Sequence, residues 1–210
     1  MRMISKKLIA QHTGGFAQTN AYLTKIGNST VLIDAPDGTI DWLEKLGEKP
    51  DILFLTHHHF DHTMDAATVK EDYDVEIFAH SKFSQNLTVA ELFSAFSGQQ
   101  IKVNDFTVDH VLGSDRTQVE LGGTLLGLSH VPGHSDDSLC LYDAEQGTLF
   151  AGDTLMAGSM GRADLPGGSQ QLLVEGIREK ILTLPTETVV YSGHGPSTTV
   201  GAEKSNPFLY

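Results

Sequence analysis

The sequence predicts a mixed α/β fold that is rich in strands and has helices in both halves. Short apolar runs typical of buried strands alternate with segments of helical apolar spacing, and glycine or proline separates many of them. Hydrophobic residues make up 40% of the 210 residues, so a sizeable core can form. The chain contains no repeat or linker, and we expect a single domain over residues 1–210.

The first half is expected to begin with a β-hairpin made by residues 21–26 and 30–34. Ile40, Leu43 and Leu46 then lie on one helical face. The further elements expected here are a short buried strand at 52–55, a helix after Asp65, a strand at 75–79 and a wholly or partly helical segment at 81–96.

The second half is expected to contain more strands and one late helix. The apolar residues Leu173, Ile177, Ile181 and Leu184 suit the buried stripe of that helix. Strands are expected at 106–112, 118–130, 138–142, 148–151 and 188–191.

Composition limits the partners and the compartment. The net charge of −13 argues against a nucleic-acid partner, because phosphate binding needs clustered lysine and arginine. No apolar run approaches the roughly 20 residues of a membrane helix, and we expect no membrane association. The basic start at residues 1–7 is not followed by the apolar core of a secretion signal. The one cysteine, Cys140, cannot form an internal disulfide, so we expect a cytoplasmic protein.

Five histidines and two aspartates occur in the order and local spacing of a two-metal hydrolytic site. Four of them form a His-x-His-x-Asp-His string directly after the apolar run at 52–55, and the other three occur singly beside glycines. Imidazole and carboxylate groups bind zinc and similar metals, which turn water into a nucleophile at neutral pH. The predicted ligands are His57, His59, Asp61, His62, His134, Asp153 and His194.

The local spacing divides these ligands between two ions. His57 and His59 point the same way in an extended segment, whereas Asp61 and His62 follow a turn and can face a second ion. His134 and His194 would each add one ligand to one of the ions. Asp153 has two carboxylate oxygens and can bridge both ions beside a water or hydroxide nucleophile. We expect Asp61 and Asp153 to be catalytic as well as metal-binding.

Other residues near these motifs have more ordinary interpretations. His58 alternates away from its neighbours and is expected to support the ligands from behind or to be exposed. Asp34 could orient a ligand histidine or cap a turn. The histidines without motif context are expected to be structural, namely His12, His80, His110 and His130.

The motifs resemble those of the metallo-β-lactamase superfamily, and the resemblance runs from residue 20 to the C-terminus. It implies an αββα sandwich of two mixed β-sheets with helices outside and metals at one edge. The chain looks most like the short glyoxalase II-like hydrolases, on the strength of residues 152–155, 161–169, 193–196 and 206–208. That likeness assigns His57, His59 and His134 to the first metal, Asp61, His62 and His194 to the second, and Asp153 to both.

The resemblance implies a binuclear metallohydrolase that cleaves small acyl thioesters, with zinc the favoured metal and iron or manganese as alternatives. The chain departs from glyoxalase II because only a short segment follows His194, where the helical domain that holds glutathione would stand. Arg162 could bind a substrate carboxylate in place of the family's lysine, or could pair with Asp164. A mononuclear iron persulfide dioxygenase, a lactonase, a β-lactamase and a non-catalytic metal-binding scaffold remain alternatives, and the oligomeric state is open.

Overall fold

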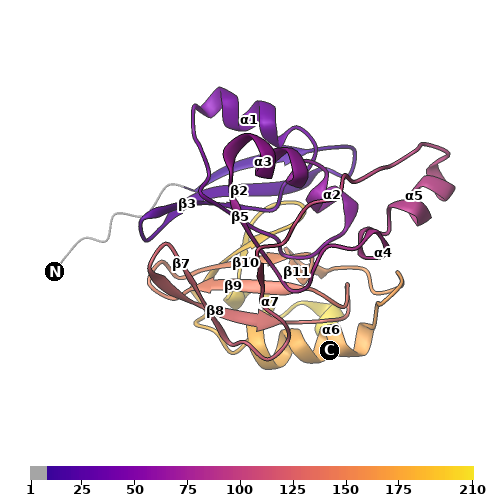
Figure 1. Ribbon diagram of the computed structural model, residues 1–210. Coiled ribbons are helices and arrows are strands. Elements are labelled where there is room, and N and C mark those ends of the chain that lie inside the picture. The colour runs from indigo at the N-terminus through magenta and orange to yellow at the C-terminus, as the bar shows by residue number, and fades with distance from the viewer. Residues whose placement is uncertain (1–8) are drawn as a thin grey trace.

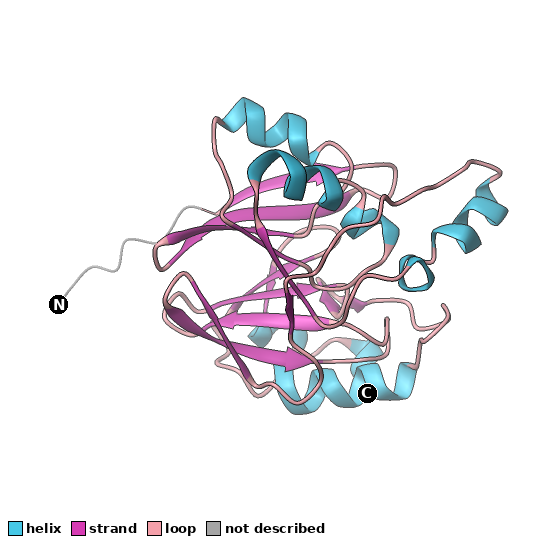
Figure 2. Cartoon of the chain, in the orientation of Figure 1, coloured by secondary structure: helices cyan, strands magenta, loops and turns pink. Residues whose placement is uncertain are grey.

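Two β-sheets face each other, and helices cover the outer side of each, in the computed structural model (Figures 1 and 2). This αββα sandwich confirms the expected fold class. The structure describes residues 9–210, so the basic start at residues 1–7 and the expectation drawn from it lie outside the described residues. No helix in the described part of the chain has the length and apolar character needed to cross a membrane.

The first sheet is antiparallel at its beginning and parallel from its third strand onward. The parallel strands therefore carry the residues that follow them to one common edge. In spatial order the strands are β1 (Ala10–Gly14), β2 (Thr19–Ile26), β3 (Ser29–Ile33), β4 (Ile52–Phe54), β5 (Glu76–Ala79) and β6 (His110–Val111).

The second sheet is antiparallel except for one parallel pair, β10 with β13. A separate two-stranded ribbon, β11 (Leu155–Met156) with β12 (Ser159–Met160), follows β10. In spatial order the strands of the second sheet are β14 (Thr198–Thr199), β13 (Val189–Ser192), β10 (Thr148–Gly152), β9 (Leu139–Asp143), β8 (Thr124–His130) and β7 (Gln118–Leu121).

The helices cover the outer faces of the sheets or extend from their edge. α1 (Thr39–Leu46) and α3 (Ala66–Tyr73) pack on the first sheet. α6 (Gln170–Gly176) and the π-helix η1 (Ile177–Ile181) pack on the second. The remaining helical segments are α2 (Phe60–Thr63), α4 (Gln85–Thr88), α5 (Ala90–Ser97), α7 (Val200–Glu203) and the 3-10 helix η2 (Pro207–Leu209).

Apolar side chains from both sheets fill the space between them. Phe54 of the first sheet and Phe150 of the second are almost fully buried in this layer. Near Ile9 and Tyr191, by the ends of β2 and β9, a cavity of about 140 Å³ remains between the sheets. This layer explains the apolar residues of the strands. Side chains on the inner face of each sheet must be apolar, because the packing of the two sheets removes them from water.

Two sequence expectations need correction. Residues 106–112 were expected to form a strand, but only His110–Val111 pair with β5. Residues 118–130 form a hairpin instead of one strand, because Gly122 and Gly123 take positive φ angles of 56° and 77° and reverse the chain. The segment 81–96 is partly helical, which is one of the two outcomes expected, since Val89 in the left-handed conformation separates α4 from α5.

The edge at the carboxyl ends of β4, β10 and β13 gathers the predicted motifs. The histidine string follows β4, Asp153 follows β10 and His194 follows β13. His134 lies in the loop between β8 and β9. The two sheets thus bring segments more than a hundred residues apart in sequence to one place, on the right-hand side of Figure 1, where α2 and β11 also lie.

Candidate metal centre

The structure brings all seven predicted ligands together, six of them in two adjoining triads and Asp153 in a set that overlaps both. In each group, the potential ligand atoms lie within 4.8 Å of one another. The groups are the triads His57, His59 and His134, and Asp61, His62 and His194; a third set, His57, His62 and Asp153, overlaps both.

Asp153 lies between the two triads with its carboxylate oxygens turned to both. Its Oδ2 is 3.5 Å from His134 Nε2 in the first triad and 3.3 Å from His194 Nε2 in the second. Its Oδ1 is 3.3 Å from His62 Nε2. A carboxylate in this position has the geometry required of a ligand shared by two ions.

Buried ligand atoms without hydrogen-bond partners test whether a metal fits. His57 Nε2, His62 Nε2 and Asp153 Oδ1 are buried and have no hydrogen-bond partner among residues 9–210. A buried polar atom left unpaired costs about 1–3 kcal/mol, so three such atoms at one point require compensation. Divalent cations bound by nitrogen and oxygen would supply it, and the donor set fits zinc, iron or manganese.

Neighbouring groups fix the orientation of the ligand histidines. His62 Nδ1 donates to Asp34 Oδ2 at 2.8 Å, and His134 Nδ1 donates to the Arg162 carbonyl at 2.8 Å. Both contacts place the ring proton on Nδ1 and leave the Nε2 lone pair free for a metal. The sequence offered Asp34 as one possibility, whereas nothing in it pointed to the Arg162 carbonyl.

Contacts made by residues of β2 hold the second triad in place. Thr19 Oγ1 donates to Asp61 Oδ2 at 2.6 Å, and the Asn20 side-chain amide donates to the Gly195 carbonyl at 2.9 Å. The Tyr22 hydroxyl donates to the Ser192 carbonyl at 2.6 Å. β2 therefore positions both Asp61 and the loop that carries His194. No pattern in the sequence pointed to these contacts, because they join residues far apart in the chain.

The first triad is electrically suited to bind a cation. Burial lowers the pKa of His57 well below its ordinary value, and the neighbouring histidines lower it further. Burial, followed by His134, lowers the pKa of His59 to about 4. Both imidazoles are therefore neutral at pH 7, which is the form that coordinates a metal.

The second triad has the opposite electrostatics. Burial disfavours the imidazolium of His62, but Asp153, Asp61 and Asp34 together raise its pKa well above the ordinary value. His194 is affected in the same way, and its hydrogen bonds to Asp153 and Asp61 outweigh burial and raise its pKa to about 10. A metal entering this triad must displace those protons.

Two glycines allow the loops to approach this closely. A Cβ on Gly193 would lie 2.1 Å from Asp153 Oδ1, and a Cβ on Gly161 would lie 2.1 Å from the Asp153 carbonyl oxygen. Neither distance is compatible with a side chain. These two positions are thus glycine because the site leaves no room for a methyl group at either of them.

Comparison with known proteins places the chain in a family. The sequence profile of the Metallo-beta-lactamase superfamily matches residues 14–194, which include every residue of both triads and Asp153. The chain belongs to the metallo-β-lactamase superfamily. This match confirms the resemblance that the sequence motifs indicated, and it agrees with the αββα fold of the structure.

Three known proteins are similar to this chain over most of their length. The probable metallo-hydrolase YqgX of Bacillus subtilis is 36% identical over 200 residues, 93% of this chain and 94% of its own length. The hydroxyacylglutathione hydrolase GloC of Haemophilus influenzae is 32% identical over 171 residues, 81% of each chain. The crystal structure of TTHA1623 in a di-iron-bound form has a TM-score of 0.84 and 35% identity, covering 95% of this chain and all of that one.

His58 lies behind the metallo-β-lactamase site and is not exposed. It is fully buried, and its Nδ1 lies 2.5 Å from Asp137 Oδ2, which also accepts from the His58 backbone amide at 3.1 Å. The sequence left open whether His58 is exposed or supports the ligands from behind. The structure shows that His58 is buried behind the ligands. Asp137 belongs to none of the predicted motifs, and the only sequence signal for its role was its position three residues after His134.

The Arg162 side chain and the histidines outside the motifs make contacts away from the two triads. Arg162 pairs with Asp164 through Nε–Oδ1 and Nη2–Oδ2 contacts of 2.7 and 2.8 Å, and its side chain is 54% exposed. Its role toward a substrate carboxylate stays a prediction. The histidines without motif context make ordinary contacts: His12 stacks on Trp42, His110 stacks on Phe78, and His80 stacks on His130.

Proposed function

We propose that this metallo-β-lactamase superfamily member is a binuclear metallohydrolase of small acyl thioesters. The observation that carries the proposal is the position of Asp153 between two complete triads, because a mononuclear enzyme has no use for the second. The likeness to a di-iron structure and to a hydroxyacylglutathione hydrolase supports the two parts of the proposal, metal number and substrate class.

The protein's own residues would hold and orient the reacting groups. His57, His59 and His134 would hold one metal, Asp61, His62 and His194 the other, and Asp153 both. When bound, two such ions lower the pKa of water and polarise a carbonyl group. The carboxylates of Asp61 and Asp153 would orient the attacking water.

Hydrolysis of a thioester fits this arrangement chemically. Water oxygen adds to the carbonyl carbon, the carbon–sulfur bond breaks, and the products are a carboxylate, a thiol and a proton. The thiol leaves easily because its pKa is low compared with that of an alcohol. The substrate is thus a small molecule, and the net charge of −13 disfavours a nucleic acid.

We further propose that the reaction takes place in the cytoplasm. The one cysteine, Cys140, is buried and unpaired, so the fold uses no internal disulfide. A fusion to a fluorescent protein, imaged in the source cell, tests the compartment.

Elemental analysis beside a substrate screen tests the function. The purified protein should carry about two zinc, iron or manganese ions per chain and hydrolyse S-lactoylglutathione or another thioester, with Asp153→Ala as the inactive control. One iron per chain with oxygen uptake on glutathione persulfide would establish the dioxygenase instead. Turnover confined to lactones or β-lactams would keep the metal centre and replace the substrate class.

A further inference from the structure

An apolar recess of about 190 Å³ opens directly beside the second triad, with Asp61 in its wall. Its apolar walls are Phe16, Phe60, Met64 and Ile101. The Phe16 and Phe60 rings stack with centroids 5.6 Å apart and planes 19° from parallel. The recess thus has two aromatic surfaces and two flexible aliphatic ones next to the proposed reacting groups.

Three separate segments converge to build the recess. Phe16 lies in the turn between β1 and β2, Phe60 and Met64 belong to α2 and its end, and Ile101 follows α5. The Phe16 side chain is 68% exposed although it is large and apolar. An aromatic ring held at the mouth of a cavity beside a reactive centre is typical of a ligand-binding surface.

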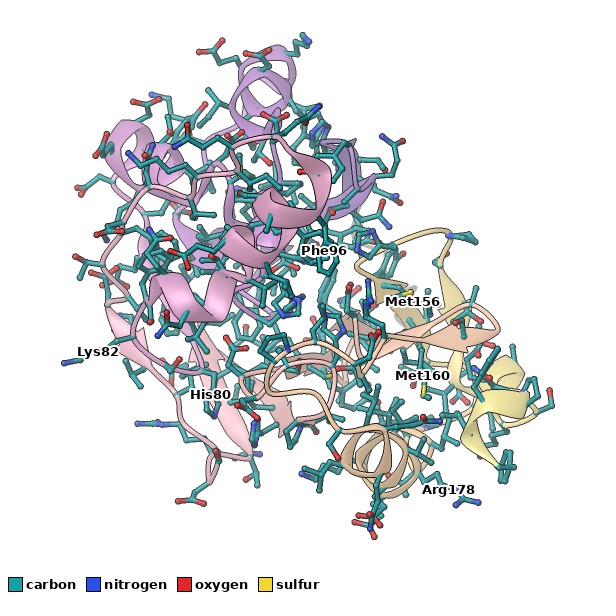
Figure 3. All side chains as sticks on the ribbon, turned by 90° about the vertical axis from the view of Figure 1, so that its right-hand side faces the viewer. His80, Lys82, Phe96, Met156, Met160 and Arg178 are labelled. Atoms are coloured by element: carbon teal, nitrogen blue, oxygen red, sulfur yellow. The ribbon has the colours of Figure 1, made fainter. Side chains whose placement is uncertain are left out.

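The same end of the molecule exposes further apolar surface. Phe96 of α5 is 83% exposed. In Figure 3 it lies above Met156 and Met160, which belong to the ribbon of β11 and β12. A large apolar side chain is therefore exposed on α5 as well as at the recess.

The charges around the recess are all of one sign. Among its described lining residues, Asp37 and Asp61 are the charged side chains, and neither lysine nor arginine lines it. A bound metal offsets Asp61, whereas Asp37 is exposed and has no ion-pair partner in the described chain. A carboxylate that lies beside Asp37 in the recess meets repulsion, and no lysine or arginine among the described lining residues offsets it.

We propose that this recess binds the acyl chain of the substrate and selects an uncharged, apolar acyl group over one that carries a carboxylate. This inference rests on the proposed thioester hydrolysis and adds the acyl class to it. Each methylene of the acyl chain buries apolar surface in the recess and so adds affinity. The negative charge of Asp37 discriminates against anionic acyl groups.

A series of thioesters on one common thiol tests the inference. From acetyl to hexanoyl, kcat/KM should rise at least about tenfold, because each buried methylene adds binding. Butyryl should be preferred to the equally long but anionic succinyl group by about tenfold or more. A flat or falling series, or equal rates for butyryl and succinyl, overturns the assignment.

Variants locate the effect in the recess. Phe16→Ala should lower the hexanoyl-to-acetyl ratio by about fivefold, and Asp37→Asn should lower the butyryl-to-succinyl ratio by about threefold. Leu125→Ala is the matched control, because it also removes an exposed apolar side chain (61% exposed) but lies on β8 of the other sheet. Equal ratios in Phe16→Ala and Leu125→Ala would contradict the assignment.

A binding measurement separates this inference from the proposed function. By titration calorimetry, the metal-loaded protein should bind hexanoate more tightly than acetate or the dicarboxylate adipate, whether or not it turns over thioesters. Hexanoate preference without thioester turnover would remove the proposed function and keep the recess. Thioester turnover with no preference for hexanoate would keep the proposed function and remove the recess as the acyl-binding site.

Discussion

The buried carboxylate of Asp34 accepts a hydrogen bond from His62 Nδ1 at 2.8 Å while its other contacts hold Thr56 just before the histidine string. Asp34 itself takes a left-handed backbone conformation with φ of 57°. One residue at the end of β3 therefore sets both the orientation of a ligand ring and the path of the chain that supplies four ligands.

Replacement of Asp34 should weaken the second metal more than the first. Asp34→Asn fits the left-handed backbone but is a weaker acceptor for His62, so affinity for the second ion should fall about 10- to 100-fold. Competition with a chromophoric chelator measures both steps. Equal loss at the two sites would mean that Asp34 acts on the whole fold, not on His62.

Alanine at the two aspartate ligands should give different metal contents. Asp61→Ala should keep about one ion per chain, because the first triad is intact, whereas Asp153→Ala should lose most of both. Elemental analysis after gel filtration measures this. One retained ion in Asp153→Ala would show that the carboxylate serves only one metal.

His58→Ala should lower stability and leave metal binding largely intact. The substitution strands the buried Asp137 carboxylate, which costs about 1–3 kcal/mol, or several degrees in Tm for a chain of this length. Thermal melts and metal content are measured beside His59→Ala, which should lose its metal. Loss of metal in His58→Ala equal to that in His59→Ala would contradict the assignment of faces.

The stability of the metal-free protein should fall as pH rises from about 6.5 to about 10. The folded-state pKa of His194 is about 10, above the ordinary value of 6.5, so its stabilising contribution is complete below 6.5 and lost as pH passes 10. Urea unfolding at a series of pH values measures the slope. His194→Gln should flatten that slope, and an unchanged slope would assign it to other groups.

Gly193→Ala should abolish metal binding, whereas Gly195→Ala should not. A methyl group at Gly193 would lie 2.1 Å from Asp153 Oδ1, but one at Gly195 meets nothing within 4 Å. Gly195 has φ of +71°, so its substitution should cost about 1–2 kcal/mol through backbone strain alone. Metal content and Tm of the two variants provide the comparison.

The sequence was most informative where the chemistry is local. The period of two in the histidine string separated His57 and His59 from His58, and the short apolar run placed the string at a strand end. The hairpin of β2 and β3, the helix α1 and the buried face of α6 also followed from local patterns. These features depend on neighbours in sequence, which one chain displays.

Long-range contacts escaped sequence reasoning. Asp137 beside His58, Thr19 beside Asp61 and the Arg162 carbonyl beside His134 pair residues 28 to 79 positions apart. The expectation of a strand at 106–112 was wrong for a related reason. This segment pairs with β5 over only two residues, and the extended character of a segment does not show how far its neighbouring strand pairs with it.

The ligands come from both sheets, at the edge opposite the cavity near Ile9 and Tyr191. Bound ions would therefore cross-link the two halves of the sandwich as a disulfide cross-links two loops, closing a segment that runs from His57 to His194. Chelation should let the sheets separate from the metal edge inward. Amide exchange in β4, β10 and β13 should then accelerate before the outer helices lose protection.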